Sequence, residues 1–134
     1  MTRQDLDSVR DLKLRAWLLV QSRASLLATA EDLVPIINDI PRPKDVKSRT
    51  ERLAVKILEI DDELDKVHEK IIQAEINLTE QIISEVDNPA LQKLAILRYV
   101  KCLSYKDISH YMKYTLRYIY ILHDKFFKRF ITEK

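Results

Sequence analysis

The sequence predicts an all-α protein in which a long N-terminal helical hairpin or coiled coil precedes a C-terminal helix-turn-helix domain. Apolar residues recur every three or four positions, which is the period of an amphipathic helix and not of a strand. The 134 residues include four prolines and no glycine, so long stretches contain no helix breaker. Without glycine, the chain lacks the phosphate-binding loops, dinucleotide-binding motifs and nucleophile elbows of common enzymes. We therefore do not expect an enzyme.

The first helix is expected over about residues 3–34. Its apolar positions run from Leu6 to Leu33 at helical spacing. Acidic residues in the opening turns suit the positive end of the helix dipole, and these are Asp5, Asp7 and Asp11. Three prolines follow, Pro35, Pro41 and Pro43. Because each lacks an amide donor and disfavours helix at the residue before it, we expect a loop here.

A second, longer helix is expected over about residues 47–86. An apolar stripe there alternates steps of four and three residues, formed by Leu53, Ile57, Ile60, Leu64, Val67, Ile71, Ala74 and Leu78. This heptad spacing favours coiled-coil packing, and a forty-residue helix would be roughly 60 Å long. We expect the first helix to fold back over the stripe. A second copy of the chain would cover the remainder in a homodimer, with extra apolar surface from Ile72, Ile76 and Ile83.

Charged and aromatic residues divide the chain near Asp87. Residues 1–87 hold 13 Lys/Arg and 18 Asp/Glu, a net charge of −5, whereas residues 88–134 hold 10 and 3, a net charge of +7. All six Tyr and all three Phe lie between Tyr99 and Phe130. The division predicts an oligomerisation region over residues 1–87 and a DNA-binding domain over residues 88–134.

Three helices are expected after residue 87. Asn88 is a candidate N-cap with Pro89 in the first helical position, and this helix reaches about residue 101. Ser104 is the next candidate N-cap, with Asp107 in the capping-box position. Thr115 caps a last helix that runs to about residue 132. Helical spacing assigns a set of apolar residues to the core: Leu91, Leu94, Ala95, Leu97, Val100, Ile108, Tyr111, Met112, Ile119, Leu122, Phe126 and Phe130.

The last two of these helices carry the chemistry of a nucleic-acid-binding surface. Lysine and arginine side chains neutralise phosphates and release counterions, and tyrosine hydroxyls donate hydrogen bonds to phosphate. Arg117 is the best candidate for a bidentate contact with guanine. The candidate DNA-binding residues are Lys106, Lys113, Thr115, Leu116, Arg117, Tyr118, Tyr120, Ile121, Lys125 and Lys128. The alternative interpretation is a solvated basic face beside tyrosines that pack a small core.

The stretches from Leu97 to Ile108 and from Tyr114 to His123 resemble region four of sigma-70-type factors. The similarity covers about 40 residues without a gap. It is closer still to the small phage and prophage regulators of Gram-positive bacteria, in which a helical N-terminal half precedes such a domain. The resemblance implies a domain that reads promoter DNA in the cytoplasm of a bacterial host, as an activator of late phage genes. It also implies RNA polymerase as a second partner.

The resemblance assigns roles to individual positions. Thr115 matches the Ser/Thr that caps the recognition helix, and His123 completes a Leu-His pair. Arg117, Tyr118 and Tyr120 fall where outward side chains approach DNA.

Two positions depart from the pattern of these regulators. Lys113 replaces the usual turn glycine, so it either adopts a strained conformation or accompanies a different turn. Ile121 stands where a polar or basic residue would meet the bases, and it offers only apolar contact, for instance with a thymine methyl group.

Two main functions follow from these observations. The first is a sequence-specific transcriptional regulator that reads DNA with the helix over residues 115–132. The second is an adaptor that binds RNA polymerase or another regulator and never engages DNA, which the apolar Leu116 and Ile121 favour. A small terminase-like packaging protein ranks third, because such proteins usually place the DNA-binding domain first.

No cofactor or metal site is expected. The three histidines have no metal-ligand spacing, and the acidic residues near Asp62 lack the ligand spacing and glycine of a calcium loop. The single cysteine, Cys102, has no organised histidine or acidic partner. Residues 2–5 do not resemble a signal peptide and no apolar run is long enough to span a membrane, so we expect an intracellular protein with no membrane partner.

Overall fold

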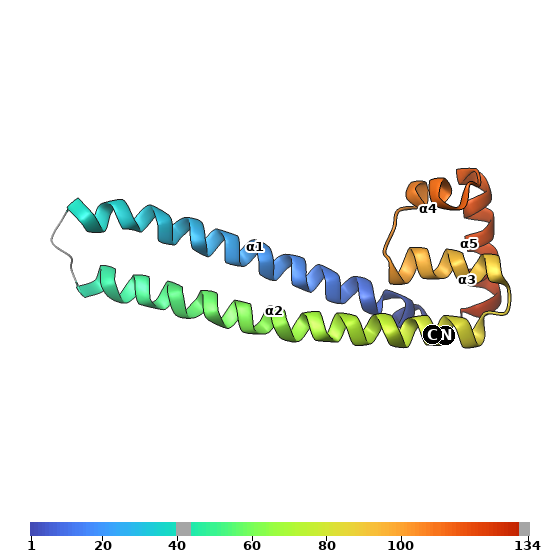
Figure 1. Cartoon of the computed structure of the whole chain (residues 1–134), viewed down its shortest axis with the longest axis horizontal. Coiled ribbons are helices and arrows are strands. Elements are labelled where there is room, and N and C mark those ends of the chain that lie inside the picture. The colour runs from blue at the N-terminus through green and yellow to red at the C-terminus, as the bar shows by residue number, and fades with distance from the viewer. Residues whose placement is uncertain (40–43, 132–134) are drawn as a thin grey trace. The chain divides into compact units, whose positions relative to one another are not determined.

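The structure, a computed structural model, describes residues 1–39 and 44–131, with the side chains of 32–39 and 44–48 left out of the description. All of its regular elements are helical, as the sequence predicts, and the described residues contain no strand. Figure 1 shows the elements in chain order, which are α1 (Arg3–Asp39), α2 (Lys44–Glu85), α3 (Pro89–Ala95), the π-helical turn η1 (Ile96–Val100), α4 (Tyr105–Met112) and α5 (Leu116–Phe130).

The chain divides into two compact units. One contains residues 1–13 together with 70–134, and the other contains residues 14–69. The first unit therefore includes residues from both sides of the boundary expected near Asp87. Its sequence carries 14 Lys/Arg and 10 Asp/Glu, a net charge of +4, whereas residues 14–69 carry 9 and 11, a net charge of −2.

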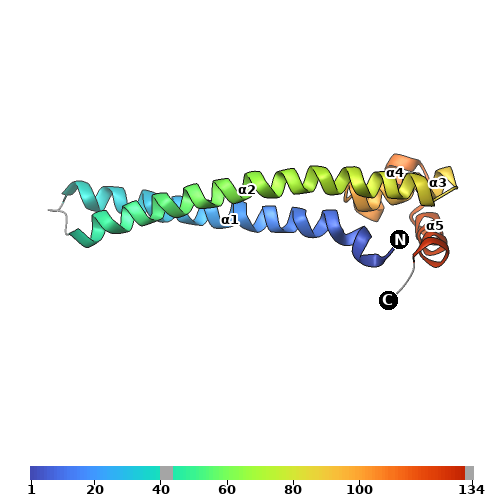
Figure 2. The ribbon, with the colours of Figure 1, turned by 90° about the horizontal axis from the view of Figure 1, so that it is seen from below.

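In the unit of residues 14–69, parts of α1 and α2 lie side by side, as the two views in Figures 1 and 2 agree. Ala16 of α1 is buried, and so are Leu64 and Val67 of the apolar stripe in α2. Ion pairs join Arg15 to Glu63 and Arg23 to Asp61 across the two helices. The stripe residues nearer the start of α2 are only half-buried; they are Leu53, Ile57 and Ile60.

The prediction of a loop at Pro35 is wrong, because α1 continues through this residue to Asp39. Proline has a φ angle that the helix accepts, and it removes one amide donor, at a cost of about 3 kcal/mol. α1 has 37 residues, so one missing backbone hydrogen bond is a small part of those that a helix of this length can form. Pro41 and Pro43 lie outside the described residues, and α2 begins at Lys44.

The unit of residues 1–13 and 70–134 has one hydrophobic core to which every element contributes. From α1 come Leu6 and Val9, which are fully buried. The other buried members are Leu78, Ile82, Val86, Leu91, Leu94, Ala95, Leu97, Val100, Ile108, Ile119, Leu122 and Phe126. The predicted core residues of the C-terminal helices are therefore mostly confirmed. The prediction that Tyr111 belongs to the core is wrong, since 61% of its surface is exposed. Met112 and Phe130 are partly buried against the core.

The N-caps predicted for the three C-terminal helices are confirmed. The Asn88 side chain accepts hydrogen bonds from the backbone amides at the start of α3, with Pro89 in the first turn. The Ser104 hydroxyl accepts from the Asp107 amide, and the Thr115 hydroxyl accepts from the Tyr118 amide. Each cap satisfies donors that the helix itself leaves unpaired.

The helix expected up to about residue 101 differs from expectation in its last turn. After Ala95 the backbone widens into η1, and the Lys101 amide donates to the Ile96 carbonyl at 3.0 Å. The chain then reverses at Cys102, whose φ of 58° is in the left-handed region. Because φ > 0 is costly for any residue other than glycine, sequence alone did not indicate this reversal.

Candidate nucleic-acid interface

Helix α5 has one buried face and one exposed face. Its buried residues follow helical spacing, namely Ile119, Leu122 and Phe126, and they pack into the core of this unit. α3 and α4 both pack against α5. The opposite face is open to solvent, so α5 is held from one side and exposed on the other.

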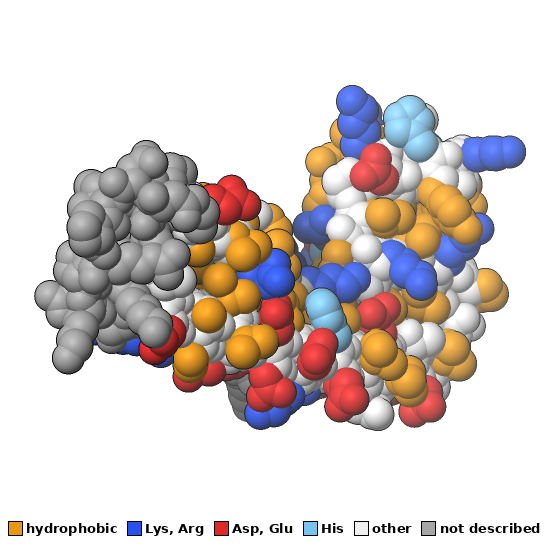
Figure 3. All heavy atoms as spheres, turned by 60° about the vertical axis from the view of Figure 1, so that its left-hand side comes forward, with side chains coloured by type: hydrophobic (Ala, Val, Ile, Leu, Met, Phe, Trp, Pro, Cys, Tyr) orange, Lys and Arg blue, Asp and Glu red, His pale blue; other side chains and the backbone are white. Residues whose placement is uncertain are grey.

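All ten candidate DNA-binding residues are exposed. They lie on α4, on the following turn and on α5, and are Lys106, Lys113, Thr115, Leu116, Arg117, Tyr118, Tyr120, Ile121, Lys125 and Lys128. These residues include basic, apolar and aromatic side chains, so the surface is mixed in character. Figure 3 shows one face of the molecule, on which basic side chains lie among apolar and acidic ones.

Most of the cations on this surface are available to an external anion. Lys106, Lys113, Arg117 and Lys125 form no ion pair within the described part of the chain. Lys128 is the exception, since its Nζ lies 3.0 Å from the Asp124 carboxylate. Both of these side chains are exposed, so the pair contributes little and a phosphate can compete for the lysine.

Tyrosine rings on the same surface contact one another in pairs. The rings of Tyr114 and Tyr118 meet edge to face with centroids 5.0 Å apart. Those of Tyr105 and Tyr120 are also 5.0 Å apart. Such contacts restrict the ring positions while Tyr118 and Tyr120 stay exposed at 42% and 50%.

The turn between α4 and α5 contains Lys113 in the left-handed conformation, with φ 60° and ψ 36°. Of the two alternatives left by the sequence, the strained conformation is the one present. The Tyr114 amide donates to the Ser109 carbonyl at 3.2 Å, and the Ser109 hydroxyl donates back to the Tyr114 carbonyl. These hydrogen bonds fix the turn and offset part of the cost of a left-handed lysine.

A polar and aromatic cluster behind this surface was not anticipated. The Tyr99 hydroxyl lies 2.5 Å from His123 Nε2, and the Tyr105 hydroxyl lies 3.4 Å from the same nitrogen. Burial, and then the charge of Arg98, lower the pKa of His123 below its ordinary value of 6.5. Burial also raises the pKa of Tyr99. We infer that neutral His123 accepts a hydrogen bond from protonated Tyr99.

Arg98 links this cluster to the chain reversal after η1. Its guanidinium donates to the Leu103 carbonyl at 2.9 Å and lies 4.2 Å from the centroid of the Tyr105 ring. The widened turn η1 carries both Arg98 and Tyr99. The helical pattern does not predict this arrangement, because a π-helical turn shifts side chains off the ordinary period.

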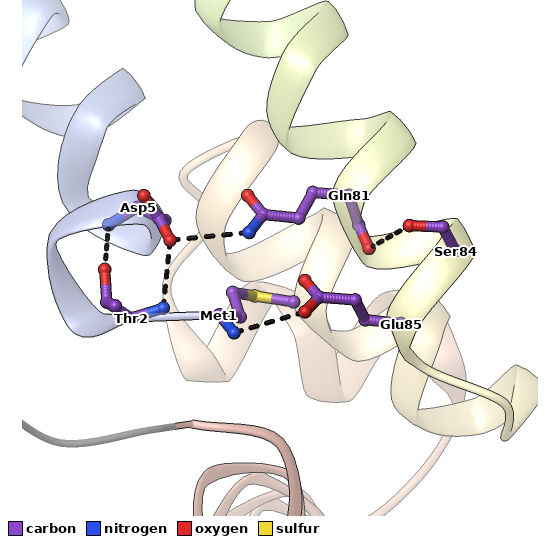
Figure 4. A network of polar contacts seen from close by, with 6 residues as sticks. All are labelled: Met1, Thr2, Asp5, Gln81, Ser84 and Glu85. Atoms are coloured by element: carbon purple, nitrogen blue, oxygen red, sulfur yellow. Dashed lines mark hydrogen bonds and ion pairs between the residues drawn. The ribbon is translucent and has the colours of Figure 1, made fainter.

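The start of α1 also belongs to this unit, although the sequence predicts a domain boundary near residue 87. Thr2 and Asp5 form a reciprocal capping box: the Thr2 amide donates to the carboxylate at 3.0 Å, and the Asp5 amide donates to the threonine hydroxyl at 3.2 Å. The first of these bonds is the main reason that the pKa of Asp5 is lowered. Figure 4 shows Gln81 donating to the same carboxylate and the Met1 amino group beside Glu85. The spacing of Thr2 and Asp5 was the signal that could have indicated this cap.

Within the described residues, the structure has neither a metal-binding cluster nor a membrane-spanning helix. No three His, Cys, Asp or Glu side chains within the described ranges come together where they could hold a metal ion. No described helix has a long enough apolar stretch to cross a membrane.

Comparison with known proteins found no match: no protein-family model fits the sequence, and neither the curated proteins nor the solved structures include a chain that it matches.

Proposed function

We propose that the protein is a sequence-specific DNA-binding transcriptional regulator, and that α4 and α5 act as a helix-turn-helix with α5 as the recognition helix. In this proposal α5 enters the major groove, and the lysines around it contact phosphates. The expected role in phage or prophage late-gene activation rests on the resemblance to sigma region four alone.

The single observation that carries the proposal is the exposed face of α5. Arg117, Ile121 and Lys125 follow one another at spacings of four residues, on the side of the helix away from buried Ile119 and Leu122. Arg117 and Lys125 have no carboxylate partner among the described residues. An unpaired arginine beside an exposed aliphatic residue suits a guanine edge and a thymine methyl group in one groove.

We also propose a homodimer formed through α2. Ile72, Ile76 and Ile83 are exposed at 60%, 46% and 57%, although helical residues between them are buried in the chain's own core. Spacings of four and seven residues place them on one side of the helix, as in a coiled-coil contact. A dimer would present two copies of α5 to two half-sites, separated by about 34 Å or a multiple of it along the duplex.

Selection from random DNA fragments tests this function. The purified full chain should enrich fragments with two related half-sites, and the Arg117→Ala variant should lose preference at one base position in each half-site. Recovery of fragments with no shared sequence would reject the proposal.

An adaptor that binds another protein is the second candidate. It is favoured by the apolar part of the same surface, where Leu116, Tyr118 and Ile121 are exposed at 40% to 44%. RNA polymerase is the partner that the resemblance suggests. In that case purified polymerase, and not DNA, should bind the chain, and Ile121→Asp should weaken that complex more than Arg117→Ala.

A further inference from the structure

A cleft lies in the unit of residues 1–13 and 70–134, beside the proposed DNA-binding surface. Its volume is about 390 Å³, which falls within the range of roughly 300–1,000 Å³ typical of ligand pockets. It is lined by three arginines, Arg3, Arg10 and Arg98, and by side chains of α5 and of the aromatic cluster. A smaller hollow of about 190 Å³ shares Arg10, Arg98 and Tyr99 with the cleft.

The smaller hollow is the basic end of this site. Cys102 and Ser104 complete its lining, which contains no carboxylate. Arg10 forms no ion pair with any described residue, and Arg98 gives one hydrogen bond, to Leu103, out of five possible N–H donors. The Tyr105 ring and the Leu103 carbonyl hold the Arg98 guanidinium in place. Two guanidinium groups with free donors are suited to a phosphate, because their planar geometry binds its oxygens in pairs.

The larger cleft is the aromatic end. It is lined by Tyr99, Tyr105, Tyr120, His123 and Phe127. The His123 and Phe127 rings have centroids 5.4 Å apart, and Tyr105 lies 5.0 Å from Tyr120. A flat ring system fits among such side chains through stacking and edge contacts.

Two carboxylates, Asp7 and Asp124, also line the cleft, so its two ends differ in charge. They are absent from the lining of the smaller hollow, where Arg10 and Arg98 meet no carboxylate, whereas the larger cleft sets them beside three arginines, so an anionic group is favoured most in the smaller hollow. Carboxylates accept hydrogen bonds, so they complement amino or hydroxyl groups on a bound ring.

We propose that this cleft binds a small phosphate monoester that carries a flat ring with hydrogen-bond donors, the chemistry of a nucleoside monophosphate. The phosphate lies between Arg10 and Arg98, and the ring lies among the tyrosines. Arg10 belongs to this unit, and the neighbouring side chains Leu6 and Val9 fix this part of α1 in the core of the unit. The site is separate from the proposed recognition of DNA by Arg117 and Lys125, and neither proposal depends on the other.

Calorimetric titration of the full chain with adenosine monophosphate tests the site, with inorganic phosphate and adenosine as separate ligands. Adenosine monophosphate should bind at least tenfold more tightly than either of them. Arg10→Gln should weaken this binding at least tenfold without loss of helicity, because Arg10 is exposed and contributes no ion pair among the described residues. The matched control is Arg129→Gln, which changes an exposed arginine that lies outside the lining of the cleft and outside the proposed DNA-binding residues, and it should leave the affinity unchanged.

A 5′-phosphorylated dinucleotide shows whether the bound phosphate monoester belongs to the end of a nucleic-acid strand or to a free nucleotide. Tighter binding of the dinucleotide would assign the site to the end of a nucleic-acid strand, and tighter binding of the monophosphate would assign it to a free nucleotide. Equal affinities of wild type and Arg10→Gln for adenosine monophosphate would overturn the proposal, as would no binding at millimolar ligand. Loss of DNA selection with nucleotide binding retained would overturn only the proposed regulator.

Discussion

Lys113 adopts a left-handed backbone in a chain that has no glycine at any position. The close approach of its Cβ to the carbonyl oxygen makes this conformation cost about 1–2 kcal/mol for a residue other than glycine. Lys113→Gly should therefore raise the free energy of unfolding by about 1 kcal/mol, measured by urea denaturation followed by circular dichroism. Lys101→Gly is the control, since Lys101 has an ordinary φ of −85° and should gain nothing. An unchanged or lower stability of Lys113→Gly would show that the turn does not strain the lysine.

The free energy of unfolding depends on pH through His123, and the burial of this side chain and the nearby charge of Arg98 set the direction. Because burial and Arg98 lower its pKa in the folded chain, the unfolded chain binds more protons as the pH falls through 6.5. The free energy of unfolding should therefore decrease from pH 7.5 to pH 5.5. The decrease should be smaller in the His123→Gln variant. It should be as large as in the wild type in the His110→Gln variant, because His110 is exposed. Identical pH dependence in the two variants would contradict the partly buried contact between Tyr99 and His123.

Several single-residue features were predictable because they are local. A cap depends on residues three apart, so Ser104 with Asp107, and Thr115 at the start of α5, could be located from the sequence. The conformation of Cys102 and the stacking of Arg98 on Tyr105 depend on the widened turn η1. No residue pattern marks such a turn, so the Arg98 side of the cleft could not be predicted.

Among the helices, α5 is the element proposed to recognise DNA. Replacing both Arg117 and Lys125 with alanine removes two exposed cations without removing any contact in the core. We expect the affinity for a selected DNA fragment to fall at least tenfold in a fluorescence anisotropy titration, with helicity unchanged. The control replaces two exposed lysines of α2, Lys56 and Lys66, and should retain affinity. Equal losses in the two double variants would reject α5 as the reading helix.

The outer side of α2 is the element proposed to form the dimer. Ile72→Asp combined with Ile83→Asp should convert a dimer into a monomer, because a charge buried without a partner destabilises the interface. Light scattering gives the mass directly. Leu18→Asp, which changes an apolar residue of α1 with similar exposure, should leave the mass unchanged. A wild-type chain that is monomeric at high concentration would contradict the proposed dimer.

At the scale of the whole chain, the division into units follows packing and not the order of charges along the sequence. The apolar spacing of α1 predicts a buried face but does not say what covers it. Leu6 and Val9 enter the same core as Phe126, and Lys13 Nζ donates to the Val100 carbonyl at 3.4 Å. These contacts join residues 87 or more positions apart, so the local patterns that predicted the helices could not predict them.

We propose that the basic surface around α5 binds the DNA backbone while its exposed face reads the bases. The most direct measurement is the affinity of the purified chain for its selected DNA across a salt series. With four phosphate contacts from Lys106, Lys113, Lys125 and Lys128, affinity should fall roughly 150-fold between 50 and 200 mM salt. An affinity that stays nearly constant over this range would contradict the claim and favour the adaptor.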